Sequence, residues 1–231
     1  MRFLWILVAA AALGQQPATR QAQTPSNPKV APLFFSETWK QTGPERDVDN
    51  NVLANANLEL HLYGQTSKQI QIAPTTPNNR QDPPNLWTGI CNGPVAATLR
   101  DKNNYVDLTG RAKIRWQTRS AGFHVVRPVV KLADGTWLVG DHADGSGDTE
   151  NFVETEFSIA SVRWLKLDIA TVTTVHADRQ KAPEVGRWVE KPDLSKVDEI
   201  GFADLMPGSG HGWGGFVNVG RIDVYGSPVK R

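Results

Sequence analysis

Apolar residues fall in short runs along residues 58–225, and glycine, proline, asparagine and aspartate gather between them. The runs are rich in β-branched and aromatic side chains, and no long stretch shows the 3.6-residue period of an amphipathic helix. This pattern predicts a series of short β-strands. The clearest lie at 58–63, 113–118, 125–132, 136–139, 152–157, 163–169, 199–202 and 217–225.

The dipeptide Asp134-Gly135 marks a turn between two of these strands. It separates an apolar run at 129–132 from another at 137–139, and Asp-Gly is a strong signal for a tight β-hairpin. Many short strands joined by such turns are typical of an antiparallel sandwich rather than an α/β fold. We therefore predict an all-β fold, an antiparallel β-sandwich of the jelly-roll type.

Alternation along two neighbouring strands places basic side chains on one face of each. Around Trp116, it turns Arg115 and Arg119 to the face opposite the indole, and in the next strand Arg127 and Lys131 share a face. If these two strands pair, the four side chains form a cationic patch. Arginine donates in a planar fork, so such a patch suits carboxylates, sulfates or heavily hydroxylated ligands. An ordinary solvated face is the alternative.

The N-terminal segment has the layout of a secretory signal. Arg2 precedes an apolar stretch that ends in small residues at Gly14, and this stretch is too short to span a bilayer. We predict a signal peptide at 1–14, a disordered spacer rich in Gln, Pro and Thr at 15–32, and one β-sandwich domain at 33–228. The mature protein is then secreted or periplasmic, with no membrane anchor after signal cleavage.

The overall charge of the chain does not favour a strongly charged partner. The chain has 25 Lys plus Arg against 24 Asp plus Glu, so its net charge gives no argument for a nucleic-acid or membrane partner.

Cys91 is the only cysteine, which rules out an internal disulfide or a cysteine-based metal cluster. We expect this thiol to be buried and inert.

Tryptophans supply the first candidate ligand contacts. Sugar rings present C–H faces that stack on indoles, and tryptophan adds a hydrogen-bonding group to that apolar contact. Trp116 and Trp164 lie inside strand patterns and are expected in the core. In contrast, Trp87, Trp188 and Trp213 lie beside Pro, Asn or Gly and are candidates for contacts from loops.

The stretch 208–215 is unusually rich in glycine and displays His211 and Trp213 between the glycines. Glycine lets the backbone pass close to a ligand or another chain. The predicted ligand-binding residues are therefore Trp87, Arg115, Arg119, Arg127, His211 and Trp213. A plain hairpin connection is the alternative for this stretch.

Acidic residues gather with glycines at 141–150. Asp141, Asp144, Asp148 and Glu150 offer the oxygen ligands that calcium accepts in irregular geometry, although their spacing is not that of an EF-hand. A structural calcium site and a metal-free polar turn both fit this pattern.

Three motifs in order carry a family resemblance. They are DLTG at 107–110, PDLSKVDEIGF at 192–202 and VGRIDVYG at 219–226. Together they resemble galactose-binding-like jelly rolls, including several carbohydrate-binding modules, over roughly residues 107–226. The resemblance implies a jelly-roll fold and a role on glycans. It speaks to the fold more than to the ligand, because this fold serves adhesion, lectin and enzyme-accessory functions alike.

The predicted function is accordingly a secreted protein that binds a glycan or polysaccharide without catalysis. A secreted polysaccharide-active enzyme, either a glycoside hydrolase or a polysaccharide lyase, is the first alternative, and a cell-envelope interaction protein is the second. No pair of carboxylates stands out by spacing, and no hydrolase or metalloprotease motif occurs. The sequence therefore names no catalytic residue and leaves enzymatic activity open.

Export through this signal predicts a mature chain that begins at Gln15. Intact-mass and N-terminal analysis of the exported protein tests this, because cleavage after Gly14 removes the apolar segment as one piece. An exported chain that retains Met1 contradicts the prediction.

Overall fold

The computed structural model describes residues 30–41, 48–73, 82–145, 150–174, 186–206 and 215–231. The predicted signal peptide at 1–14 lies outside these residues, as does all but the last part of the spacer at 15–32. Those two assignments stay predictions.

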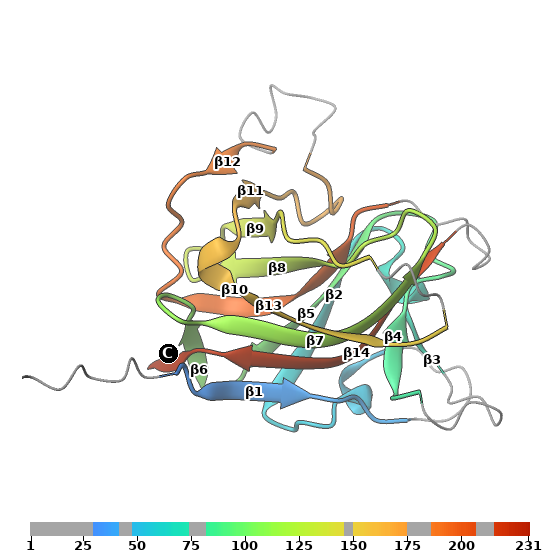
Figure 1. The fold of residues 1–231 in the computed structure, drawn as a ribbon, viewed down its shortest axis with the longest axis horizontal. Coiled ribbons are helices and arrows are strands. Elements are labelled where there is room, and N and C mark those ends of the chain that lie inside the picture. Colours follow the sequence, from blue (N-terminus) through green and yellow to red (C-terminus); the bar gives the residue numbers. More distant parts are fainter. Residues whose placement is uncertain (1–29, 42–47, 74–81, 146–149, 175–185, 207–214) are drawn as a thin grey trace, which may run out of the picture.

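The described chain is almost entirely β-structure arranged in two antiparallel sheets, which Figure 1 shows as stacked layers. The six-stranded sheet contains β1 (Leu33–Glu37), β3 (Gln71–Ala73), β4 (Asn85–Trp87), β7 (Lys113–Ala121), β10 (Val153–Ser158) and β14 (Phe216–Tyr225). The nine-stranded sheet contains β2 (Leu58–Tyr63), β5 (Val95–Asp101), β6 (Asn104–Asp107), β8 (Arg127–Leu132), β9 (Trp137–Gly140), β11 (Trp164–Lys166), β12 (Trp188–Val189), β13 (Val197–Asp204) and β15 (Ser227–Lys230).

The strand orders are β10-β7-β14-β4-β3 in the first sheet, with β1 also on β14, and β12-β11-β9-β8-β13-β5-β2 in the second. In the second sheet β6 pairs with β13 and with β15. Three short 3-10 turns complete the described elements: η1 (Asn50–Val52), η2 (Ser67–Gln69) and η3 (Ile159–Ser161). This arrangement confirms the predicted antiparallel β-sandwich and is consistent with a jelly roll. Among the residues that the structure describes, no helix is long and apolar enough to cross a membrane.

The predicted hairpin at Asp134-Gly135 joins β8 to β9. The two strands pair antiparallel, with Val130 opposite Leu138. Gly135 has a φ of +89°, a conformation that favours glycine, and the Asp134 carboxylate accepts a hydrogen bond from the backbone N–H of Thr136. The local sequence thus fixes this turn directly.

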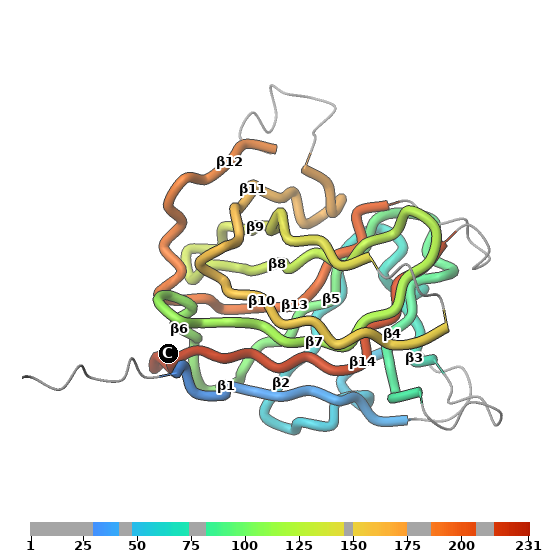
Figure 2. Tube along the Cα trace, viewed as in Figure 1, coloured from blue at the N-terminus to red at the C-terminus, as the bar shows by residue number. Residues whose placement is uncertain are grey.

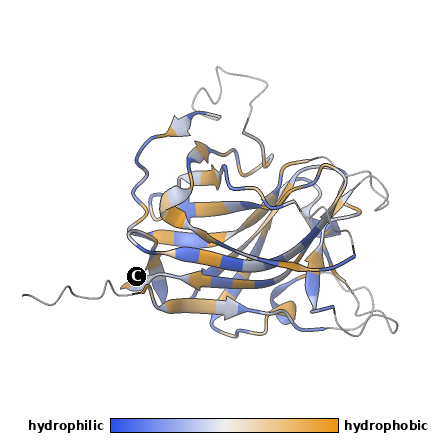
Figure 3. Ribbon diagram, in the orientation of Figure 1, coloured by the Kyte–Doolittle hydropathy of each residue, from blue (hydrophilic) through white to orange (hydrophobic). Residues whose placement is uncertain are grey.

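Alternation along the strands builds the core between the sheets. Ile114 and Trp116 on β7 are buried, whereas Lys113 and Arg115 lie on the opposite face. Figure 3 shows the same exchange of apolar and polar residues along the strands. The buried set also includes Trp164, as predicted, and Cys91, where burial raises the pKa of the thiol to about 12.

The first described strand pairs with a late strand in the six-stranded sheet. β1 pairs antiparallel with β14, and Figure 2 shows blue β1 beside red β14. Trp39, just after β1, is buried and donates from its indole nitrogen to the carbonyl of Val219, at 2.9 Å. Contacts this distant in the sequence close the sandwich along one edge.

The pairing on which the cationic patch depends does not occur between the described strands. β7 pairs with β10 and β14, whereas β8 pairs with β9 and β13, so the two strands lie in different sheets. The chain crosses from one sheet to the other between Ala121 and Arg127. Arg115 and Arg119 therefore share no sheet face with Arg127 and Lys131, and the four side chains form no common cationic patch.

Gly201 provides a test of how tightly the central strands pack. A Cβ atom at this position would lie 2.0 Å from the carbonyl oxygen of Ala97 on β5. We expect Gly201→Ala to lower the free energy of unfolding by about 3 kcal/mol, because the clash is with backbone. Gly93→Ala is the control, since its Cβ would meet only Thr66 at ordinary contact distance, and we expect a change within about 0.5 kcal/mol. Chemical denaturation measures both, and equal effects would contradict the packing argument.

Candidate functional site

One face of the nine-stranded sheet is turned away from the sandwich core, and we call it the Glu199 face. Register partners on it form a continuous row across seven strands, from β2 to β12. The row is His61, Thr98, Gly201, Val129, Val139, Leu165 and Trp188. Directly opposite residues share a face, so these side chains line one surface.

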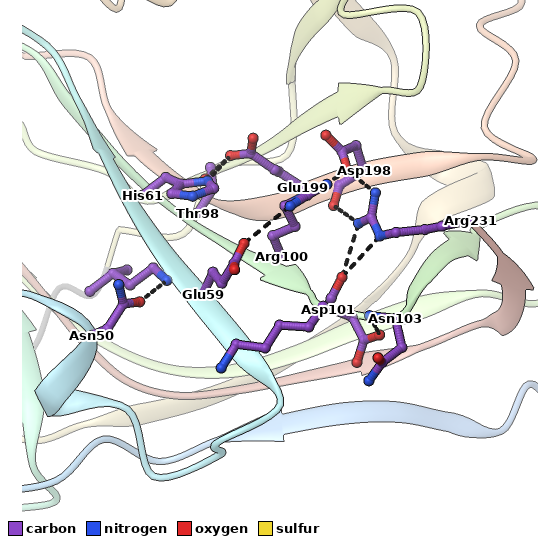
Figure 4. Close-up of polar contacts among 12 residues, drawn as sticks. Asn50, Glu59, His61, Thr98, Arg100, Asp101, Asn103, Asp198, Glu199 and Arg231 are labelled. Carbon is purple, nitrogen blue, oxygen red and sulfur yellow. Dashed lines mark hydrogen bonds and ion pairs between the residues drawn. The ribbon is translucent and has the colours of Figure 1, made fainter.

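Glu199 anchors the β2 end of this face. Its side chain is almost fully buried, and Oε2 accepts hydrogen bonds from the Tyr63 hydroxyl at 2.9 Å and the Thr98 hydroxyl at 2.6 Å. The Lys131 ammonium donates to Oε1 at 2.9 Å. His61 Nδ1 lies 3.0 Å from Oε2, without the alignment of a hydrogen bond. Figure 4 shows His61 and Thr98 beside Glu199.

These partners decide the protonation of the cluster. Burial by itself raises the pKa of Glu199, but His61, Thr98, Lys131 and Tyr63 outweigh it and hold that pKa at about 2. The carboxylate in turn raises the pKa of His61, and burial together with Glu199 raises that of Tyr63. An ionised carboxylate with both oxygens engaged is a poor general base. We therefore assign Glu199 a structural role.

A second ion network continues from Glu199 toward the C-terminus (Figure 4). Asp198 Oδ1 contacts Arg100 Nε at 3.0 Å and Arg231 Nη1 at 2.5 Å, and Arg100 also pairs with Glu59. Arg231 adds hydrogen bonds to the carbonyl of Asp101. These charges satisfy one another within the described chain.

Apolar side chains fill the middle of the Glu199 face. Val129 and Val139 are buried there against Leu167 and Val172, from a segment that crosses the sheet. The rings of Tyr63 and Trp137 lie 4.8 Å apart, although three strands separate β2 from β9. Four strand spacings in a flat sheet amount to about 19 Å, so the sheet curls toward this face.

The face opens into a pocket at its other end. A cavity of about 390 Å³ lies over β8, β9, β11 and β12, within the size range of small-ligand sites. The lining includes the polar side chains of Arg127, Asp141, Arg163 and Thr174 and the aromatic ring of Trp188.

Polar and aromatic groups line this pocket together. Trp188 is 48% exposed, and the guanidinium of Arg163 lies 4.4 Å from the centre of its ring. Asp141 Oδ2 accepts from Arg163 Nε at 2.7 Å, and Oδ1 accepts from the Arg163 backbone N–H at 2.8 Å. Burial raises the pKa of Asp141, but these bonds bring it below its usual range. Arg127 donates from Nη1 to the carbonyls of Gly140 and Asp141.

Three other predicted ligand residues lie on the outer face of the six-stranded sheet. Arg115 donates from Nε and Nη2 to the buried Asp223. Arg119 pairs with Asp82 at 3.0 Å, and its guanidinium lies over the Phe152 ring. Both arginines are thus neutralised by carboxylates from distant parts of the chain.

Trp87 shares that outer face with Arg119. Asn218 lies between them as the register partner of both. Trp87 is half-buried, and a Cβ at Gly89 would meet its indole, so part of the ring packs against its own loop. The two side chains share a face, and their role in ligand binding stays a prediction.

The remaining predicted site residues are divided between described and undescribed parts of the chain. His211, Trp213 and Asp148 lie outside the described residues. Asp144 accepts hydrogen bonds from the Trp116 indole at 2.5 Å and contacts His142, whereas Asp141 faces Arg163.

The three described members of the predicted calcium set, Asp141, Asp144 and Glu150, have other partners. Glu150 contributes a backbone carbonyl to Arg119. Within the described ranges, no group of three or more His, Cys, Asp or Glu side chains is placed to hold a metal ion. The four-residue calcium site stays a prediction.

Sequence reasoning missed Arg163 and gave Asp141 a different role. Arg163 directly precedes the apolar run of β11, and a charged residue at a strand end gives no local signal of what it faces. Trp188 was the signal that the sequence offered for this pocket, because it is an indole in a polar stretch near glycine and proline.

The low pKa of Glu199 gives a pH dependence with a definite sign. A carboxyl whose pKa is depressed on folding stabilises the protein above its unfolded pKa of about 4.3, and that contribution is lost as the pH falls toward 2. We expect Glu199→Gln to flatten the pH dependence of unfolding between pH 5 and about 2. At pH 7 it should destabilise by roughly 1–3 kcal/mol. Denaturation series over this pH range measure both, and an unchanged slope contradicts the assignment.

Comparisons with known proteins find similarity only among solved structures. No protein-family model and no curated protein matches the chain. The family 11 carbohydrate-binding module of the cellulosomal cellulase Lic26A-Cel5E of Clostridium thermocellum has a TM-score of 0.41 at 14% identity, over 79% of this chain and 94% of that one. An exo-β-agarase has a TM-score of 0.37 at 12% identity, over 77% of this chain and 24% of its own. The carbohydrate recognition domain of Emp47p has a TM-score of 0.33 at 11% identity, over 78% and 93%.

Proposed function

We propose that this protein is exported and binds a glycan, without catalysis, in the pocket over β8, β9, β11 and β12. The observation that carries the proposal is the half-exposed indole of Trp188 at a pocket lined by Arg127, Asp141 and Arg163. A sugar ring requires an apolar surface for its C–H face and hydrogen-bonding groups for its hydroxyls. This pocket offers both within one opening.

Preorganisation supports the proposal. Arg163 is held between the Trp188 ring and the Asp141 carboxylate, and Asp141 is held in turn by the Arg163 backbone. A ligand entering this pocket therefore has few side chains to order, which lowers the entropic cost of binding. The indole is also kept in place by pairing of β12 with β11, where Trp188 lies opposite Leu165.

The chemistry of the Glu199 face fits binding better than turnover. Tyr63, His61 and Lys131 are residue types that can transfer protons, but they converge on a carboxylate that is already ionised and bonded. The pKa of Tyr63 is raised, which moves this phenol away from the range useful for a base near neutral pH. We accordingly place ligand contact in the pocket and structural support at Glu199.

Trp188→Ala is expected to weaken glycan affinity about tenfold, because losing roughly 1.4 kcal/mol of ring stacking and burial corresponds to that factor. Calorimetric titration with an oligosaccharide panel, together with assays for new reducing ends and unsaturated products, measures binding and turnover. Phe123→Ala is the control, because its ring is 87% exposed and does not line the pocket. It should leave affinity unchanged, whereas a loss on Trp87→Ala with none on Trp188→Ala would move the site to the six-stranded sheet.

Two further outcomes separate the alternatives. Product formation supports the polysaccharide-active enzyme in place of the binding protein. No binding and no turnover across the panel leaves the cell-envelope interaction protein.

A further inference from the structure

The described side chains that line the Trp188 pocket carry charges that do not balance. Arg127 and Arg163 bring two guanidinium groups, and Asp141 brings one carboxylate that is fully engaged with Arg163. Among the described residues that line it, the pocket therefore keeps one net positive charge, and that charge belongs to Arg127.

Arg127 differs from the other arginines of the two sheets. Arg100 pairs with Asp198, Arg115 with Asp223 and Arg119 with Asp82. Among the described residues, Arg127 contacts no carboxylate and donates only to the carbonyls of Gly140 and Asp141, at 3.4 and 3.2 Å. Holding a half-buried cation without a counter-charge is costly, and an anionic ligand removes that cost.

The two backbone bonds also orient the guanidinium. Both of them start from Nη1, so in the described structure the edge formed by Nε and Nη2 makes no hydrogen bond. That edge is the fork with which arginine receives an oxyanion through two parallel hydrogen bonds.

We propose that the pocket selects an acidic sugar, whose carboxylate or sulfate is received by Arg127 while its ring packs against Trp188. This inference rests on the proposed glycan-binding function and names its ligand class. Arg163 and Asp141 then serve the neutral hydroxyls, because their charges already cancel each other. Uronate and sulfate sugars share the oxyanion that Arg127 requires.

Pairs of oligosaccharides that differ only in charge test the proposal. Oligogalacturonate with its methyl ester tests the carboxylate, and κ-carrageenan oligosaccharides with their desulfated form test the sulfate. By isothermal titration calorimetry, we expect the acidic member of at least one pair to bind about tenfold more tightly or better. The pair that shows the preference identifies the oxyanion.

Arg127→Gln should abolish that preference while the neutral member keeps its wild-type affinity. Arg111→Gln is the matched control, because it makes the same charge change at an exposed turn before β7, and it should keep the preference. Thermal unfolding checks that both variants are folded. A folded Arg127→Gln protein that still prefers the acidic member overturns the proposal.

Salt supplies a measurement that needs no variant. The preference of the wild-type protein should shrink severalfold between about 20 and 500 mM NaCl, because screening weakens a charge pair and leaves ring stacking. A preference that does not change with salt overturns the proposal. Equal binding of acidic and neutral members overturns the acidic-sugar inference alone. Failure of every oligosaccharide to bind overturns the glycan-binding function and the inference with it.

Discussion

The buried carboxylate of Glu199 ties four adjacent strands of the nine-stranded sheet together. It lies on β13 and receives Tyr63 from β2, Thr98 from β5 and Lys131 from β8. A charge buried at this depth is tolerated only when donors surround it, so these strands must keep the register that brings the donors in. On the same face, the Tyr63 ring also meets Trp137 from β9.

The Glu199 face has three parts with different chemistry. Ion networks around Glu199 occupy the β2 end, and the buried valines of β8 and β9 fill the middle beneath Leu167 and Val172. Only toward β12 does the face open into a pocket, where Trp188 is half-exposed. The ion networks and the buried valines therefore stabilise the fold, and the proposed ligand contacts lie near the edge of the sheet.

The arginines show why partners decide function more than residue type does. Arg115, Arg119 and Arg127 look alike in the sequence, each lying on a strand where neighbouring residues alternate between the two faces. In the fold, Asp223 and Asp82 neutralise the first two, from positions 108 and 37 residues away. Arg127 meets backbone carbonyls instead, which leaves its charge available to a ligand.

Local pattern determined the elements of this protein that depend on near neighbours. Alternation identified the buried face of β7, and Asp134-Gly135 identified the β8–β9 hairpin, because both follow from backbone geometry over a few residues. Which strands pair depends on contacts between distant segments, so alternation alone could not decide whether β7 pairs with β8, and the two strands lie in different sheets. The tertiary structure alone decided that Arg127 and Trp188 share a pocket, since register across β8, β9, β11 and β12 brings them onto one face.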